Sequence, residues 1–244
     1  MTKIYEGNRY ILIRTGYSDP AVHRHMAAHV IISLQGKMRA YTENEVITCH
    51  GVMIPSGTAH RIDTQGNPAL VFLFDCTSNV SSRITAVSTV PETMCGEIVS
   101  CYCRLEKQEL NEAFSELENL ILSYFGMVAC EYHVTDERIL KAMEYIRIMS
   151  PEKITCKEVA DYTHLSQDRF SHLFKEKTGM TFASYVIYQR LMRVYANVFR
   201  GMSITEAALE AGFSGSSHFA DVNRRVFGNP MRSIMENASF EKVS

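Results

Sequence analysis

The sequence predicts a multidomain protein of the α+β class, in which an N-terminal β-barrel or jelly roll precedes an all-α part with two helix-turn-helix units. Two observations predict this division. Residues 1–103 contain short apolar runs separated by glycine and proline turns, whereas apolar residues beyond position 105 recur at helical spacing. A stretch of the C-terminal half is also repeated. The 244 residues, 46% of them hydrophobic, are enough for two modest cores.

The N-terminal part, residues 1–103, is predicted to be built from strands. Apolar runs such as 30–32 and 70–74 are short, and turn signals such as Gly36 and Pro55-Ser56-Gly57 separate them. Many short strands at this spacing are typical of an antiparallel sandwich or barrel.

Residues 104–135 are predicted to hold one helix and a linker. Apolar residues recur at spacings of 4, 3, 4 and 3 at Leu110, Phe114, Leu117, Ile121 and Tyr124. Such a stripe is typical either of a helix packed on its own barrel or of a helix that pairs two subunits, and the sequence leaves both open. The segment from 126 to 135 has no clear period and is predicted to be the linker.

Residues 136–244 carry the repeat. Asp136 precedes a helical pattern that ends at Ser150-Pro151. Residues 158–166 then align with 206–214 at an offset of 48, and a long helix over about 182–199 separates the copies. Each copy has a small residue where two helices cross, a turn residue that tolerates positive φ, and a serine as N-cap. These pairs are Ala160 and Ala208, His164 and Gly212, and Ser166 and Ser214.

The stretch from about Asp136 to Ala238 resembles the DNA-binding domain of the AraC/XylS family of transcriptional regulators. The run from Ser166 to Gly179 and the run from Ile204 to Ser214 carry the resemblance. It implies two recognition helices that enter successive segments of the major groove on one face of DNA. The DNA-binding residues implied are Gln167, Asp168, Arg169, Ser171, His172 and Lys175 in the first helix, and Ser216, Ser217, Ala220, Asp221 and Arg224 in the second. For any single position, the alternative is a solvated helix face.

Three residues depart from the family pattern. Asp221 stands where a basic residue is common, Asn223 where an apolar anchor is usual, and Phe182 where proline is common. We therefore expect the first unit to carry more of the base reading than the second.

The N-terminal histidines resemble the two cupin motifs. The first is His23-x-His25 followed by His29 and Gly36, with His29 at the position of the usual glutamate; the second is Pro55-x-Gly57-x-x-His60. The resemblance implies a site made of His23, His25, His29 and His60. Neutral imidazoles can hold Zn²⁺, Fe²⁺, Mn²⁺ or Ni²⁺. The alternatives are an organic effector bound without metal, or histidines that are simply hydrogen-bonded groups of the barrel.

Charge and cysteine usage set further limits. Net charge is −2, and residues 1–134 carry 10 basic and 14 acidic side chains against 15 and 13 in residues 135–244. This weak bias predicts DNA affinity from placed contacts rather than from a diffuse basic field. Neither a signal peptide nor a membrane span is predicted. The seven cysteines, an odd number without a C-x-x-C pair, predict reduced thiols in the cytoplasm, with a redox or metal role for Cys101 and Cys103 on one strand face as the alternative.

Together these features predict a bacterial, cytoplasmic transcription regulator with an effector-binding domain over 1–103. Its predicted partners are double-stranded promoter DNA, a small-molecule or metal effector, a second copy in a homodimer and RNA polymerase, with no membrane. The alternative from another class is a metal-dependent cupin enzyme, such as a dioxygenase or isomerase, with a helical appendix.

Overall fold

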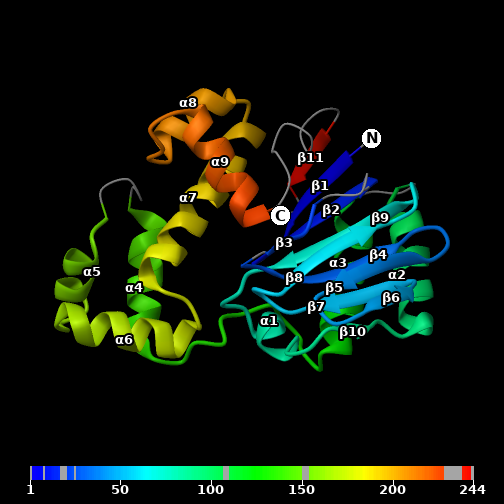
Figure 1. The fold of residues 1–244 in the computed structure, drawn as a ribbon, viewed down its shortest axis with the longest axis horizontal. Coiled ribbons are helices and arrows are strands. Elements are labelled where there is room, and N and C mark those ends of the chain that lie inside the picture. The colour runs from blue at the N-terminus through cyan, green and yellow to red at the C-terminus, as the bar shows by residue number, and fades with distance from the viewer. Residues whose placement is uncertain are drawn as a thin grey trace. The chain divides into compact units, whose positions relative to one another are not determined.

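The computed structural model describes residues 2–7, 9–16, 21–24, 26–106, 110–149, 154–227 and 238–242 (Figure 1). The chain forms two compact units. The N-terminal unit comprises residues 1–131 and 225–244, and the C-terminal unit comprises residues 132–224. Strands dominate the first unit and helices make up the second, so the predicted α+β class is confirmed.

The strands of the N-terminal unit form two sheets. In the described residues, one sheet has seven strands in the order β10-β7-β4-β9-β2-β1-β11, and the other has four in the order β3-β8-β5-β6. The two sheets are not closed into a barrel, which refines the predicted barrel or jelly roll to a two-sheet arrangement. The strands are β1 (Thr2–Gly7), β2 (Tyr10–Gly16), β3 (His23–Arg24), β4 (Ala28–Ser33), β5 (Met38–Thr42), β6 (Val46–Cys49), β7 (Gly51–Ile54), β8 (Ala59–Asp63), β9 (Pro68–Phe74), β10 (Ser88–Thr89) and β11 (Ala238–Lys242).

The seven-stranded sheet is covered on both faces. Ile31 and Val71 pack with Met38 and Ile62 of the four-stranded sheet. On the other face, residues such as Phe72 pack against helices α2 (Glu92–Leu105) and α3 (Leu110–Tyr124). Burial of both faces explains why the apolar runs in β4 and β9 are continuous rather than alternating.

Two helices replace the strands predicted for the end of the 1–103 region. Helix α1 spans Asn79–Arg83 and α2 spans Glu92–Leu105. In α2 the buried residues include Met94, Ile98 and Cys101, at helical rather than strand spacing. Cys101 is consequently buried and Cys103 exposed, so the prediction that they share a strand face is wrong.

The apolar stripe of α3 lies against its own unit. Phe114, Leu117 and Ile121 are buried in the core beneath the sheet, and the ring of Phe114 stacks on that of Tyr10 at 6.2 Å between centroids. Tyr124, the last member of the stripe, is 41% exposed. Of the two alternatives, these contacts favour packing on the helix's own domain; pairing of subunits stays a prediction.

The connector, residues 126–135, contains no helix, and hydrogen bonds to Asn79 restrain its first half. Asn79 donates from its backbone N–H to Glu131 O at 2.7 Å and from its amide to Ala129 O at 3.0 Å. Its side-chain oxygen accepts from the N–H of Glu131 at 3.0 Å. The first half of the predicted linker is therefore part of the N-terminal unit, and the C-terminal unit starts at Tyr132.

The C-terminal unit is all helical, with an internal repeat. Its helices are α4 (Glu137–Ile148), α5 (Cys156–Tyr162), α6 (Gln167–Thr178), α7 (Phe182–Phe199), α8 (Ile204–Glu210) and α9 (Ser216–Phe227). Asp136 caps α4, as the sequence predicts, whereas the Ser150-Pro151 stop signal lies outside the described residues. Strand β11 was not predicted; it follows the helical region and pairs parallel to β1, from Thr2 with Ala238 to Glu6 with Lys242.

Candidate nucleic-acid interface and ligand pocket

The first helix-turn-helix unit has the predicted local geometry. Its turn residue His164 has a φ of 56°, and the N–H of Leu165 donates to Ala160 O at 2.9 Å. The hydroxyl of Ser166 caps α6 by accepting from the N–H of Arg169. Gly179 ends α6 in the left-handed conformation with a φ of 75°, which glycine adopts without steric cost.

Most of the predicted DNA-binding residues of α6 lie on its exposed side. Phe170, Leu173 and Phe174 face the core. The exposed predicted residues are Gln167, Asp168, Arg169, His172 and Lys175. Ser171 is only half-exposed, because its hydroxyl lies 3.3 Å from the sulfur of Cys156 at the start of α5. Five of the six predicted side chains of α6 are therefore exposed.

The second unit repeats this turn with one residue inserted. The N–H of Phe213 donates to Ala208 O at 2.9 Å, the same bond as in the first unit at an offset of 48, and Gly212 has a φ of 85°. Helix α9 begins at Ser216, so the prediction of Ser214 as its N-cap is wrong: Gly215 is inserted between them. From this point the offset between the two units is 49.

Predicted residues of α9 also lie on its outer side. Ser217, Asp221 and Arg224 are exposed, whereas Ser216 and Ala220 are half-buried. Gly228, which stands 49 residues after Gly179 in the sequence, lies outside the described residues.

His218 is an exposed residue that the sequence analysis missed. Its Nδ1 accepts from the N–H of Ser214 at 3.4 Å and lies 3.1 Å from the hydroxyl of the same serine. Because Nδ1 accepts, Nε2 carries the proton of the neutral ring and is a donor at the start of α9. The repeat offset could have found it, since His218 corresponds to Arg169.

Within the C-terminal unit, helix α7 joins the two helix-turn-helix units, with α5 and α6 at one end of α7 and α8 and α9 at the other (Figure 1). Its 18 residues span about 27 Å at 1.5 Å per residue. Successive major-groove segments on one face of DNA lie about 34 Å apart. The length of α7 is therefore comparable to the distance between successive major-groove segments, as expected if each exposed recognition helix enters one of them.

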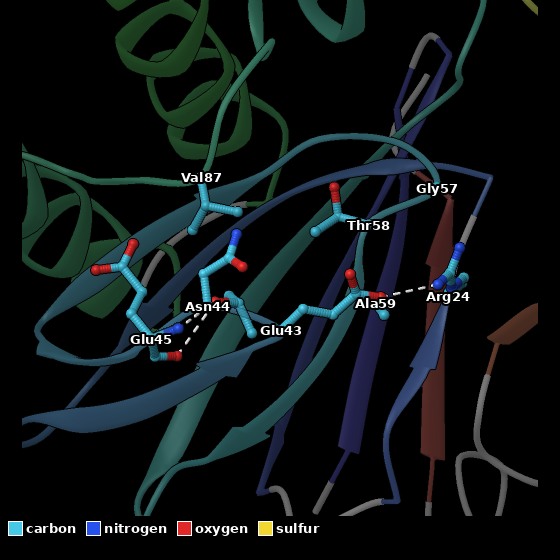
Figure 2. Close-up of a pocket in the computed structure, with 9 residues that line it drawn as sticks. Arg24, Glu43, Asn44, Glu45, Gly57, Thr58, Ala59 and Val87 are labelled. Carbon is cyan, nitrogen blue, oxygen red and sulfur yellow. Dashed lines mark hydrogen bonds and ion pairs between the residues drawn. The ribbon is translucent and has the colours of Figure 1, made fainter.

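A pocket of about 390 Å³ opens in the N-terminal unit (Figure 2). Its walls come from the β5–β6 turn, the β7–β8 turn, the end of β3 and Val87. The lining is polar: Thr42, Thr58 and Asn44 supply hydroxyl and amide groups, and Arg24 pairs with Glu43 at 2.9 Å. Such a pocket suits a small hydrogen-bonding molecule better than an apolar one.

Three of the four predicted histidines come together beside this pocket. The rings of His23 and His60 lie 4.7 Å apart and those of His29 and His60 lie 5.1 Å apart, between centroids. His60 pairs in register with Thr42 of the pocket. His25 lies outside the described residues.

Burial favours the neutral form of these histidines. Nδ1 of His60 donates to Thr58 O at 2.8 Å and Nδ1 of His23 to Ala21 O at 2.7 Å, so Nε2 is the acceptor nitrogen in both. Burial lowers the pKa of His60 to about 4 and also lowers the pKa values of His23 and His29. Within the described ranges, no three His, Cys, Asp or Glu side chains are placed to hold a metal ion.

The fold and the exposed recognition helices define the C-terminal unit as a double helix-turn-helix domain of the DNA-binding class. Residues 159–237 match the family model described as a helix-turn-helix domain. Regulatory protein PocR of Salmonella typhimurium is 31% identical over 93 residues, which are 38% of this chain and 31% of that protein. The probable transcriptional regulator LumQ of Photobacterium leiognathi is 21% identical over 218 residues, covering 84% of this chain and 88% of that protein.

Solved structures agree on the fold of the whole chain. An apo form of ToxT from Vibrio cholerae matches with a TM-score of 0.63 at 10% identity, over 94% of this chain and 98% of that one. A ToxT structure with an unsaturated fatty acid bound matches with a TM-score of 0.58 at 12% identity, over 96% and 99%. The chain carries a helix-turn-helix domain over residues 159–237, as the sequence predicted, and the two relatives are named as regulators.

No helix in the described ranges is long and apolar enough to cross a membrane.

Proposed function

We propose that this protein is a sequence-specific DNA-binding transcriptional regulator whose activity responds to a small molecule bound in the N-terminal unit. The repeated turn carries the proposal: the same backbone hydrogen bond closes both units 48 residues apart, from Leu165 to Ala160 and from Phe213 to Ala208. Each turn presents a helix with an exposed polar side, which is the arrangement that major-groove reading requires.

The DNA-binding part is tested by selection of the full chain on randomised duplexes at moderate salt, followed by footprinting upstream of its own gene. We expect an enriched site with two protected major-groove segments. The Lys175→Ala variant should bind every sequence more weakly, whereas Lys37→Ala, the same charge change in the N-terminal unit, should leave binding unchanged. Absence of any enriched sequence for the wild-type chain contradicts the proposal.

The effector part rests on the polar pocket. Hydroxyl groups of Thr42 and Thr58, the amide of Asn44 and the Arg24–Glu43 ion pair provide both donors and acceptors, and Val87 provides one apolar wall. We therefore propose a small, polar effector. The fatty acid in the ToxT structure belongs to that protein, and its chemistry does not match this lining.

The effector is tested by the thermal shift of the full chain with a free amino acid, a monosaccharide and an unsaturated fatty acid. A polar compound that stabilises the wild type should stabilise Thr58→Val less, because valine keeps the shape and removes the hydroxyl. Thr48→Val, on an exposed strand position of the same sheet, is the matched control. Stabilisation by the fatty acid alone contradicts a polar effector.

A metal effector is a second version of this proposal. It rests on the acceptor Nε2 of His23 and of His60, and it requires the three histidines to rearrange, since no three such side chains of the described residues are placed to hold a metal ion here. Elemental analysis of the purified chain, repeated for His60→Asn, tests it: stoichiometric metal lost in the variant supports a metal site. Homodimer formation and contact with RNA polymerase are also part of the proposed regulator; sedimentation and a polymerase pull-down on promoter DNA test them.

A further inference from the structure

Asn223 is a fully buried amide on the second recognition helix. It is 0% exposed and lies beside Phe219 and Val222 on the inner side of α9. At the offset of 49, the corresponding residue of the first unit is Phe174, which is also buried and lies in ring contact with Phe170, Phe182 and Tyr185. The two units thus use different chemistry at the same position: aromatic packing in the first and a buried amide in the second.

Tyr195 of α7 provides a donor for the oxygen of this amide. Its hydroxyl donates to Oδ1 of Asn223 at 2.9 Å, and the tyrosine itself is only 7% exposed. Burial raises the pKa of Tyr195, so the hydroxyl remains a donor over the physiological range. Because both side chains are buried, rotation of α9 away from α7 would break this hydrogen bond at a place that bulk water does not reach.

A second polar contact ties α7 to the same unit. Nη1 of Arg190 lies 3.4 Å from the carbonyl oxygen of Gly212 in the turn before α9. Arg190 and Tyr195 are five residues apart on α7, so one helix holds both the turn and the recognition helix. Apolar contacts tolerate sliding, whereas a buried hydrogen bond is directional and favours one orientation.

We propose that Tyr195 and Asn223 are a positioning pair that sets the rotation of α9 about its axis. The rotation decides which bases face the exposed side chains Ser217, Asp221 and Arg224. The pair thus determines sequence preference in the DNA segment read by the second unit without touching DNA. This inference rests on the proposed DNA-binding function.

The test compares the wild type with Tyr195→Phe, Asn223→Leu and the double variant Tyr195→Phe/Asn223→Leu. Each single variant removes the buried hydrogen bond between Tyr195 and Asn223, and both should lower the melting temperature. The double variant replaces the pair with apolar groups and should recover the melting temperature. Phe174→Leu, at the corresponding position of the first unit, is the matched control for a loss of packing.

Base preference is measured for each folded variant by selection from randomised duplexes, position by position. At positions read by the second unit, we expect the double variant's preference for the bases that the wild type selects to fall roughly tenfold. At positions read by the first unit, its preference should be unchanged. Phe174→Leu should leave second-segment preference intact. A stable double variant with wild-type preference in both segments overturns the inference.

The outcomes separate the inference from the function on which it rests. If the wild type selects no sequence at all, the proposed function fails and the positioning role fails with it. If the wild type selects a site and the double variant selects the same one equally well, only the positioning role fails. Recovery of both the melting temperature and second-segment preference assigns the pair to stability alone and also overturns it.

Discussion

Lowering the pH should reduce the free energy of unfolding of the N-terminal unit, because three imidazole rings with lowered pKa values lie close together there. His29 and His60 are each 2% exposed, and the ring of His23 lies against that of His60. Burial is the largest cause of the lowered pKa in all three histidines. Protonation of His29 or His60 in the folded chain places a charge at a buried position in contact with another imidazole ring.

The sign and size follow from His60. Its pKa is lowered from 6.5 to about 4, so the unfolded chain takes up the proton first as the pH falls. The stability associated with the neutral ring is therefore complete above pH 6.5 and is lost between pH 6.5 and about pH 4. Linkage gives a loss of about 2 kcal/mol between pH 7.5 and pH 5 from this residue alone. His23 and His29 shift in the same direction and add to the loss.

The assay is urea unfolding followed by circular dichroism at both pH values, with hydrogen exchange of Ala59–Asp63 as the local readout, corrected for the intrinsic pH dependence of exchange. The variant is His60→Asn, whose amide can still donate to Thr58 O as Nδ1 does but does not titrate. The wild type should lose about 2 kcal/mol more than the variant. Equal losses in the two proteins would refute the reasoning, since the acid sensitivity would then come from other groups.

Three further predictions concern the interface and the packing. His172→Ala should relax base preference at one position by about 1–3 kcal/mol, whereas Lys175→Ala should lower affinity uniformly and reduce the salt slope by about 1, both measured by titration at several salt concentrations. Gly51→Ala should cost about 1–3 kcal/mol, because its new Cβ would lie 2.7 Å from a cysteine sulfur; thermal unfolding checks this against Gly96→Ala, where nothing lies within 4 Å of the new Cβ. Asn79→Ala should speed amide exchange in the connector without moving the melting temperature of the C-terminal unit; unchanged exchange would show that its hydrogen bonds do not restrain the connector.

Local rules predicted the C-terminal unit well. Positive φ at His164, the cap at Ser166 and the ends of α6 all follow from residues within one or two turns of each other, and the structure has each of them. Ser214 failed as a cap for an equally local reason: Gly215 lengthens the second turn by one residue, so α9 begins at Ser216 and not directly after Ser214.

Features that depend on distant partners were not predictable in this way. Strand β11 pairs with β1 at the opposite end of the chain, and no pattern within residues 238–242 specifies that partner. Cys101 and Cys103 were assigned by strand alternation, although the buried set around them has the period of a helix. The histidine site was predicted from motif spacing alone, and the structure brings three of its members together. Motif spacing does not reveal how deeply each ring is buried, and burial is the largest cause of their lowered pKa values.

The two helix-turn-helix units are unequal for a reason that the sequence pattern only partly indicated. Asn223 departs from the apolar residue typical of the AraC/XylS pattern that this stretch resembles, which by itself predicts a weaker second unit. The structure pairs it with Tyr195, 28 residues away, so the departure is compensated inside the domain rather than left as a buried defect. Asp221 has no such compensation: it is exposed on the outer side of α9, where a carboxylate can accept from the amino group of cytosine and repels phosphate. The second unit should therefore be well ordered and selective, with the carboxylate of Asp221 offsetting part of the attraction between phosphate and the exposed Arg224 of the same helix.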